Sequence, residues 1–197
     1  MQIISEDQLQ NAIDVLAQGG VIVFPTETSY GLGCDATNAA AVERIFEIKS
    51  RDRGKALPVI LPGLERASEF VVMSQKAIEF ATRYWPGPLN IIAPIAPGSP
   101  IAPACGQDGF QSVRVSSHPI AARLARELDR PIVATSANIS GQDALYDVAL
   151  VEASFVHAAD NPDLLVDGGV LPQVLASTTV KIVDDAHEIL RQGEIHV

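Results

Sequence analysis

The chain has 197 residues, of which 47% are hydrophobic and 19% charged, which excludes an intrinsically disordered protein and is ordinary for a globular one. Its 24 acidic and 14 basic side chains give a net charge of −10, a balance that argues against a protein whose main ligand is a nucleic-acid backbone. There is no apolar run of membrane-spanning length and no export signal, and the cysteines, Cys34 and Cys105, suit a reducing compartment, so we expect a cytoplasmic protein without membrane contact.

Apolar residues repeat at helical and strand spacing through the first half of the chain. A capping box at 5–8 precedes a helix that ends at Gly19–Gly20, and the apolar run 21–24 predicts a buried strand. We expect the residues after this strand to form a loop. The next predicted elements are a helix from Asn38 to about 50, a strand at 57–61, and a helix from Ser74 that turns Ala77, Ile78, Ala81 and Trp85 to the core and is broken at Trp85-Pro86.

The second half continues the alternation of helices and strands. Strands are predicted at 89–93, 112–115, 131–134, 164–166, 178–183 and 187–191, with helices from Pro119 and at 147–154, and a Pro/Gly-rich loop at 94–109. No internal repeat or linker interrupts this order. The sequence therefore predicts a single α/β domain over residues 1–197.

Small polar residues gather at the ends of several predicted strands. Hydroxyl and amide side chains follow strand 21–24 at residues 25–28, follow strand 131–134 at residues 135–141, and precede the strand at 178 in residues 176–179. One such segment is typical of a turn. Three of them predict a pocket, because ligands of α/β sheets bind where such loops converge at one end of the strands.

Four cations lie within seven residues, from Lys49 to Lys55, in an otherwise acidic chain. A solvated basic helix end is one interpretation, since cations stabilise a helix C-terminus by about 0.3 to 1 kcal/mol each. The other is an anion site, favoured because the cluster lies between a core-facing helix and a buried strand. Arg114 and Arg191 add cations on predicted strands, and such a set suits a polyphosphate.

Familiar catalytic motifs are missing from the sequence. There is no phosphate-binding Gly-x-x-x-x-Gly-Lys loop, Ser136 lacks a nucleophile-elbow context, and Cys34 has no base close in sequence. The histidines, at 118, 157, 187 and 196, lack metal-ligand spacing, so no metal site is predicted. Chemistry without a nucleophile points to positioning and charge stabilisation, as in phosphoryl and nucleotidyl transfer.

Six ordered segments together resemble the YrdC/TsaC family of threonylcarbamoyl-AMP synthases. They are Pro25-Thr26-Glu27-Thr28-Ser29-Tyr30-Gly31-Leu32-Gly33, Lys49-Ser50-Arg51, Trp85-Pro86-Gly87-Pro88-Leu89, Ser112-Val113-Arg114-Val115, Ser136-Ala137-Asn138-Ile139-Ser140-Gly141 and Ser177-Thr178-Thr179-Val180. The resemblance runs from about residue 8 to Gly193 and is that of the short form without an extra C-terminal domain. It implies a twisted mixed sheet with flanking helices around a concave, cationic cavity.

The resemblance also implies a reaction and its participants. L-Threonine, bicarbonate and ATP would give threonylcarbamoyl-AMP and pyrophosphate, with Mg²⁺ carried by the nucleotide. The product would pass to the tRNA threonylcarbamoyl transferase machinery that makes N6-threonylcarbamoyladenosine at position 37 of tRNA. With a charge of −10, contact between this chain and tRNA is expected to be weak or indirect.

Site residues follow from the resemblance position by position. Lys49, Arg51, Ser136 and Asn138 match the catalytic tetrad at the nucleotide and pyrophosphate end. Thr26, Tyr30 and Arg114 match residues that bind threonine, with Arg114 on its carboxylate, and Ser177 and Arg191 match nucleotide contacts. Departures from the pattern include Asp52 in place of a proline and Asn90 in place of a hydroxyl residue.

Two other functions are open at this point. One is a paralogue that keeps the cavity but binds RNA or acts otherwise without synthesis, and the other is a passive nucleotide-binding or scaffolding module. Retention of both the Lys-x-Arg and Ser-x-Asn pairs favours the enzyme over the paralogue. We expect Lys49→Ala and Asn138→Ala to nearly abolish turnover with little loss of stability.

Overall fold

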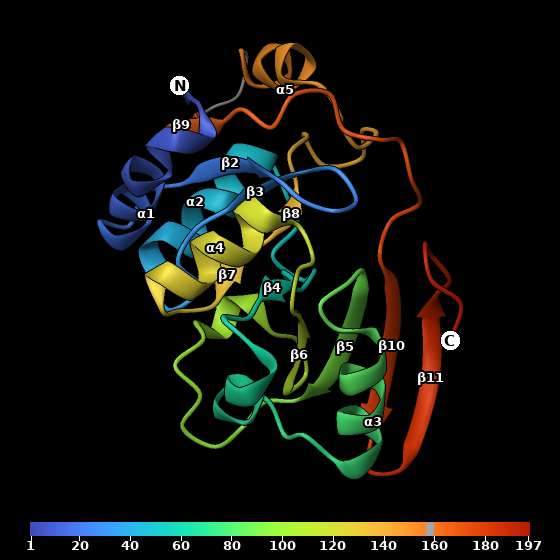
Figure 1. Ribbon diagram of the computed structural model, residues 1–197. Helices are drawn as coiled ribbons and strands as arrows, with labels where there is room; N and C mark the ends of the chain where they lie inside the picture. Colours follow the sequence, from blue (N-terminus) through green and yellow to red (C-terminus); the bar gives the residue numbers. More distant parts are fainter. Residues whose placement is uncertain (157–159) are drawn as a thin grey trace.

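The computed structural model describes residues 1–156 and 160–197 and arranges them as an α/β fold with two mixed sheets (Figure 1). The helices are α1 (Leu9–Ala17), α2 (Ala39–Lys49), α3 (Gln75–Tyr84), α4 (Pro119–Leu128) and α5 (Val148–Phe155). The strands are β1 (Gln2–Ile4), β2 (Ile22–Pro25), β3 (Tyr30–Gly33), β4 (Val59–Ile60), β5 (Leu89–Pro94), β6 (Phe110–Arg114), β7 (Ile132–Val133), β8 (Thr135–Ser136), β9 (Leu164–Val166), β10 (Thr178–Val183) and β11 (Ala186–Arg191). Short 3-10 helices occupy Glu6–Gln8, Leu64–Glu69 and Pro103–Cys105.

Both sheets combine parallel and antiparallel pairs. The five-stranded sheet has the order β1-β9-β2-β3-β8, with parallel pairing from β1 to β2 and antiparallel pairing from β2 to β8. The six-stranded sheet has the order β11-β10-β5-β6-β4-β7, in which antiparallel and parallel pairs alternate. The predicted α/β class with mixed strands and flanking helices is confirmed; the strands divide between two sheets.

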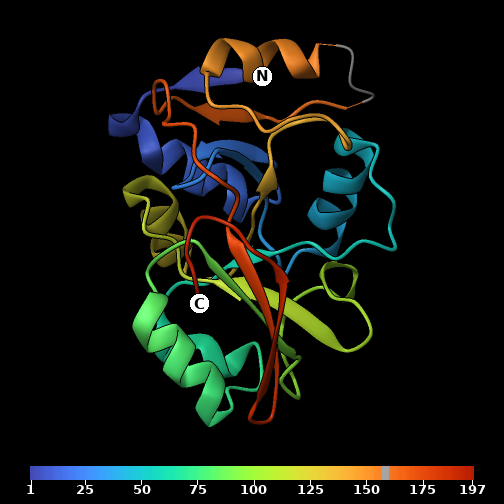
Figure 2. The ribbon, with the colours of Figure 1, turned by 90° about the vertical axis from the view of Figure 1, so that its right-hand side faces the viewer.

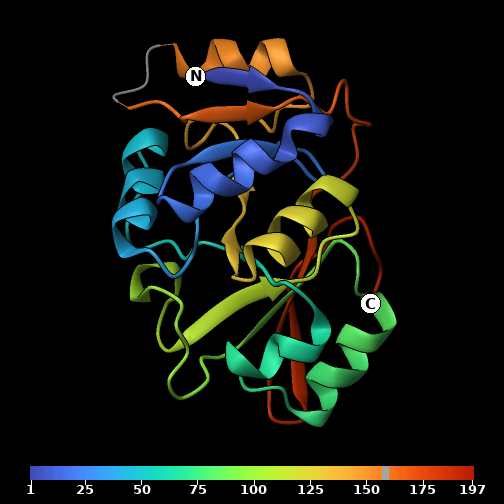
Figure 3. The ribbon, with the colours of Figure 1, turned by 60° about the vertical axis from the view of Figure 1, so that its left-hand side comes forward.

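Strand β2 is buried on both faces, which explains its unbroken apolar run. Val23 belongs to the core that includes α2, whereas its neighbours Ile22 and Phe24 belong to the core formed with α1 and α4. This follows from the alternation of side chains along a strand. Helix α2 accordingly lies on one side of the sheet, and α1 and α4 lie together on the other (Figures 2 and 3).

The segment after β2 does not remain a loop, contrary to the sequence prediction. Residues 26–29 make a tight turn, and the chain returns as β3, antiparallel to β2 and paired on its other edge with β8. At the end of β3, Gly33 allows the chain to approach β7 closely, because a Cβ atom at this position would lie 1.9 Å from the carbonyl oxygen of Val133. Tertiary pairing here outweighs the low strand propensity of glycine.

Most of the other predicted elements are confirmed, with a few differences. Strand β1 was not predicted, and Thr135 and Ser136 form a short strand where a loop was expected. Ile78 of α3 is 42% exposed, so its predicted core position is wrong. Trp85 is buried as predicted, but it follows the helix, and its indole N–H donates to the carbonyl of Leu89 at 2.7 Å.

The two sheets share one main core and meet at the polar end of their strands. Residues of β2, β3, β5, β6 and β10 contribute to the same apolar cluster, and Asp35 pairs as an isolated bridge with Ile132 of β7. Among the described residues, no helix has the length and apolar character that crossing a membrane requires. The bounds of a single domain, 1–197, stay a prediction.

Candidate active site

A cavity of about 340 Å³ opens between the two sheets. The first sheet contributes the turn after β2 and strand β8, and the second contributes the ends of β5, β6 and β11 and the residues that precede β10. The three polar segments noted in the sequence thus meet at one place. A second cavity of about 150 Å³ adjoins the first, with which it shares Arg51, Ser136, Asn138 and Gln142.

The large cavity is locally cationic although the chain as a whole is acidic. Arg51, Arg114 and Arg191 border it, and none of the described residues around it is Asp or Glu. Burial lowers the pKa of Arg51, and burial together with the charge of Arg114 lowers the pKa of Arg191. These shifts indicate that the charges of Arg51 and Arg191 are incompletely compensated, so an anionic ligand would be favoured here.

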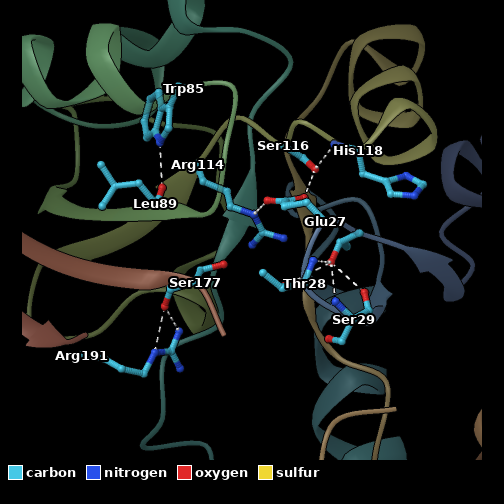
Figure 4. A network of polar contacts seen from close by, with 11 residues as sticks. Glu27, Thr28, Ser29, Trp85, Leu89, Arg114, Ser116, His118, Ser177 and Arg191 are labelled. Atoms are coloured by element: carbon cyan, nitrogen blue, oxygen red, sulfur yellow. Dashed lines mark hydrogen bonds and ion pairs between the residues drawn. The ribbon is translucent and has the colours of Figure 1, made fainter. Parts of the chain in front are cut away.

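Arg114 is held by a buried network behind the cavity (Figure 4). Its Nε donates to a carboxylate oxygen of Glu27 at 3.0 Å, and the two side chains are only 5% and 10% exposed. The other oxygen of Glu27 accepts from the hydroxyl of Ser116, whose oxygen in turn accepts the backbone N–H of His118 at 3.2 Å. The ion pair fixes the guanidinium while its far end projects toward the space between Ser177 and Thr28 (Figure 4).

Lys49 lies inside the protein and ties helix α2 to the segment after β8. It is 1% exposed, and its Nζ donates to the carbonyls of Ser136 and Asn138 and to Asn138 Oδ1 at 2.9 Å. Asn138 Nδ2 continues the network by donating to the carbonyls of Gln142 and Asp143. Burial lowers the pKa of Lys49 to about 7, and the charge of Arg51 acts in the same direction.

Arg51 and Ser136 are the members of the tetrad that reach the ligand space most directly. Arg51 is half-buried and donates from Nη2 to the carbonyl of Ala56 at 2.9 Å. Ser136 lines the cavity, and its hydroxyl donates to Asn138 Oδ1 at 2.7 Å, so its oxygen can still accept a hydrogen bond. The structure therefore brings Lys49, Arg51, Ser136 and Asn138 together, around the junction of the two cavities.

The predicted nucleotide contacts, Ser177 and Arg191, lie on the second sheet. Arg191 donates from Nε and Nη2 to the carbonyl of Ser177, at 3.0 and 2.8 Å. Both residues line the large cavity, on the side opposite the turn after β2 (Figure 4). This pairing joins the last strand to the start of β10, although the two residues are 14 positions apart.

The two remaining predicted residues differ in their placement. Thr26 lines the cavity, but its hydroxyl donates to the carbonyl of Ser29 at 2.7 Å and so stabilises the turn. Tyr30 is fully buried and does not line the cavity. Its hydroxyl donates to the carbonyl of Gly169 and accepts from the N–H of Gly168, so it holds the segment after β9. Its predicted contact with threonine stays a prediction that this placement does not support.

Several residues around the cavity were not assigned from the sequence. Thr28, Ser29, Asn90, Gln142 and Tyr146 line it without having been named as site residues. Glu27, which has no assigned role in the sequence, is the partner of Arg114, 87 residues away. No periodicity or spacing signals a pair so far apart in the sequence.

The donor groups around the cavity are hydroxyls, amides and guanidinium groups, which suit an anion better than a metal ion. Over residues 1–156 and 160–197, no group of three or more His, Cys, Asp or Glu could hold a metal. His118 caps α4, where its Nδ1 accepts the N–H of Ile120, and His157 lies outside the described residues.

Comparisons with known proteins agree with this architecture. A threonylcarbamoyl-AMP synthase of Pseudoalteromonas translucida (strain TAC 125) is 39% identical over 149 residues, which are 73% of this chain and 78% of the relative. The crystal structure of P. abyssi Sua5 complexed with L-threonine has 30% identity and a TM-score of 0.90, and the match covers 98% of this chain but only 58% of that one. E. coli YciO has 25% identity and a TM-score of 0.85, with 98% of this chain and 94% of that chain covered.

A family model matches nearly the whole sequence. Residues 14–193 fit the model named for Sua5, YciO and YrdC, whose description is telomere recombination. This match covers far more than half of the chain, and the fold and the cavity between the sheets are consistent with it. The chain therefore belongs to the Sua5/YciO/YrdC family.

Proposed function

We propose that this chain is a threonylcarbamoyl-AMP synthase, which uses L-threonine, bicarbonate and ATP and releases pyrophosphate. One observation carries the proposal: Arg114 on the second sheet and Arg51 with the Ser136–Asn138 segment on the other side border a single cavity of about 340 Å³. Such a cavity can hold a small carboxylate and a triphosphate at the same time. The name of the 39% identical relative supports the same reaction.

The chemistry has two steps. The neutral amine of threonine attacks the carbon of bicarbonate, an N–C bond forms, and water leaves to give the carbamate. A carbamate oxygen then attacks the α-phosphorus of ATP, and the bond from that phosphorus to the pyrophosphate breaks as the new O–P bond forms. Negative charge grows on the phosphoryl oxygens, and preorganised cations in a partly buried site lower the barrier.

Each cavity residue has a role in this proposal. Arg114, fixed by Glu27, binds the carboxylate of threonine. Arg51, which borders the smaller cavity, binds the phosphates that leave as pyrophosphate. Lys49 and Asn138 shape the segment at 136–143 that faces these phosphates. Ser177 and Arg191 contact the nucleotide from the second sheet.

ATP enters as its magnesium complex in this proposal. The metal would be held mainly by the phosphates, because the described lining of the large cavity supplies no carboxylate and that of the smaller cavity supplies only Asp52. Further along, the product reaches the tRNA threonylcarbamoyl transferase machinery, with weak or indirect tRNA contact because the chain carries a net charge of −10. We place the reaction in the cytoplasm, consistent with the two free cysteines.

The test is pyrophosphate release by the pure protein. We expect release only when ATP, bicarbonate and L-threonine are all present, together with an adenylate that carries label from bicarbonate. Nucleotide binding without release would favour the passive module and contradict the proposal. The same result with RNA bound tightly would favour the paralogue.

A matched pair of arginine variants makes the test local. Arg51→Ala should lose turnover by about 100-fold or more, the scale seen when a charge-stabilising group is removed. Arg53→Ala, two positions away, should stay near wild-type, because the Arg53 side chain is 63% exposed and pairs with Glu43 on the surface. Equal losses in both variants would contradict the assigned site.

A further inference from the structure

Asn90 presents a buried hydrogen-bond acceptor that no residue in the described part of the chain satisfies. The residue is 5% exposed, and its Oδ1 has no donor partner. Two other buried side-chain atoms, Ser99 Oγ and Gln111 Oε1, share this property, but neither of those residues borders the large cavity. A buried acceptor without a partner costs about 1 to 3 kcal/mol. Asn90 is thus the one of these three residues that borders the large cavity.

The strand geometry points Asn90 toward the ligand space. Its neighbours on β5, Leu89 and Ile91, are fully buried in the main apolar core. Because side chains alternate along a strand, Asn90 faces the opposite side, where the cavity lies. Strand β5 runs between β6 and β10 in the middle of the second sheet (Figure 1), so this position is fixed by pairing on both edges.

Asn90 lies beside Arg114. Ile91 of β5 pairs with Val113 of β6 in antiparallel register, and the next residue outward on each strand is Asn90 and Arg114. Side chains that are opposite in such a pair project from the same face, about 5 Å apart at Cβ. Both line the cavity, and Glu27 occupies the Nε of Arg114. The amide oxygen of Asn90, an acceptor, therefore lies next to the guanidinium group of Arg114, which can donate hydrogen bonds to a ligand.

An α-amino acid carries the complementary pair of groups. Its carboxylate accepts hydrogen bonds and its nitrogen, attached to the adjacent carbon, donates them. We propose that Asn90 Oδ1 accepts a hydrogen bond from the α-amino nitrogen of the amino-acid substrate while Arg114 binds the carboxylate. This inference rests on the proposed function for the identity of that substrate as threonine.

A neutral acceptor suits the chemistry of this nitrogen. A carboxylate at position 90 would hold the amine as ammonium, which has no lone pair with which to attack bicarbonate. An amide oxygen accepts equally from the neutral amine and from the N–H of the carbamate that follows. Asn90 thus makes the same hydrogen bond before and after the N–C bond forms.

The experiment measures amino-acid binding and folding stability separately. Asn90→Leu keeps the side-chain size but removes the acceptor, and calorimetric titration with L-threonine should show about 3- to 10-fold weaker binding. Its urea midpoint without substrate should equal or exceed that of the wild-type protein, because an unpaired buried polar atom is gone. A residue with a purely structural role would instead lower the midpoint.

Two substrate analogues identify the atom that Asn90 contacts. 2-Aminobutanoate keeps the amino group but lacks the hydroxyl, and Asn90→Leu should weaken its binding by the same factor as that of threonine. 3-Hydroxybutanoate keeps the hydroxyl but lacks the amino group, and both proteins should bind it equally. Asn90→Asp should bind threonine at least as well as Asn90→Leu does. It should release pyrophosphate at least about 10-fold more slowly than the wild-type protein, because its carboxylate keeps the amine protonated.

The outcomes separate this inference from the proposed function. Unchanged threonine binding in Asn90→Leu, a loss that follows the hydroxyl, or a lowered urea midpoint would overturn the role of Asn90 even in an active enzyme. If the wild-type protein releases no pyrophosphate but its threonine affinity still depends on Asn90 through the amino group, the proposed function fails while the amino-acid contact stands.

Discussion

The replacement of Lys49 by methionine tests how the cavity wall is held. Methionine keeps the length and volume of the side chain but donates no hydrogen bonds, so three acceptors each lose one donor. The Ser136 carbonyl keeps the Asn138 N–H and Asn138 Oδ1 keeps the Ser136 hydroxyl, whereas the Asn138 carbonyl loses its one donor among the described residues. The Asn138 side chain would then keep the hydrogen bonds from its Nδ2 and the one from the Ser136 hydroxyl. The earlier expectation of little stability loss on mutation of Lys49 or Asn138 has to be revised, because both side chains are buried.

The magnitude follows from opposing contributions. Hydrogen bonds to a charged donor contribute about 1.5 to 3 kcal/mol each, but burial of an ammonium costs several kcal/mol and offsets part of the sum. The freed acceptors can partly reach water, because the 150 Å³ cavity adjoins them. We expect Lys49→Met to lower the free energy of unfolding by about 2 to 4 kcal/mol, with turnover lost.

Urea denaturation measures this loss, as a lower midpoint at an unchanged m-value. Arg51→Met is the matched control: Arg51 is half-buried and makes one short hydrogen bond, to Ala56, so its loss should be below about 1 kcal/mol although turnover also falls. A loss in Lys49→Met no larger than in Arg51→Met would refute the view that Lys49 organises the segment at 136–143.

Three further predictions concern charge and burial. Glu27→Gln weakens the ion pair that holds Arg114, so it should raise the KM for threonine about tenfold and leave the KM for ATP within about twofold. Glu43→Gln on the surface is the control and should change neither KM. Steady-state kinetics measure both constants. The pKa of Lys49 is about 7 in the folded protein against 10.5 ordinarily, so between these pH values the unfolded chain binds more protons than the folded one. The stability advantage of wild-type over Lys49→Met should therefore grow as pH rises from 7 to 9. A difference in urea midpoints that stays flat or falls over this range would contradict a lowered pKa of Lys49. Burial raises the pKa of Cys34 above its usual range and that of Cys105 to about 12, so a thiol reagent at pH 8 should label neither cysteine in the native protein but both in urea, and fast native labelling would show that these sites open.

Local signals predicted most helices and strands correctly. Asn38 caps α2 with its side chain on the N–H groups of Ala40 and Ala41, as the sequence indicated, and Pro119 begins α4. The apolar run at β2 indicated a strand buried on both faces. These features depend on residues that are neighbours in the chain, so pattern and capping chemistry suffice to predict them.

Features that depend on partners distant in the chain could not be predicted from the sequence. Strand β3 contains Gly31 and Gly33 and forms because β2 and β8 flank it, not because of its own propensity. Lys49, at the end of a helix rich in charge, could equally have pointed to solvent; its inward direction follows from acceptors almost 90 residues away. For the same reason the roles of Glu27 and Tyr30 became visible only once their partners were placed.

The central claim is that one cationic cavity between the two sheets orients a carbamate against a nucleoside triphosphate. A crystal structure with a non-hydrolysable ATP analogue and L-threonine tests it most directly. The account predicts phosphates against Arg51 and the Ser136–Asn138 segment, the threonine carboxylate on Arg114, and its nitrogen within hydrogen-bonding distance of Asn90. Nucleotide and threonine bound at separate places, or outside this cavity, would contradict it.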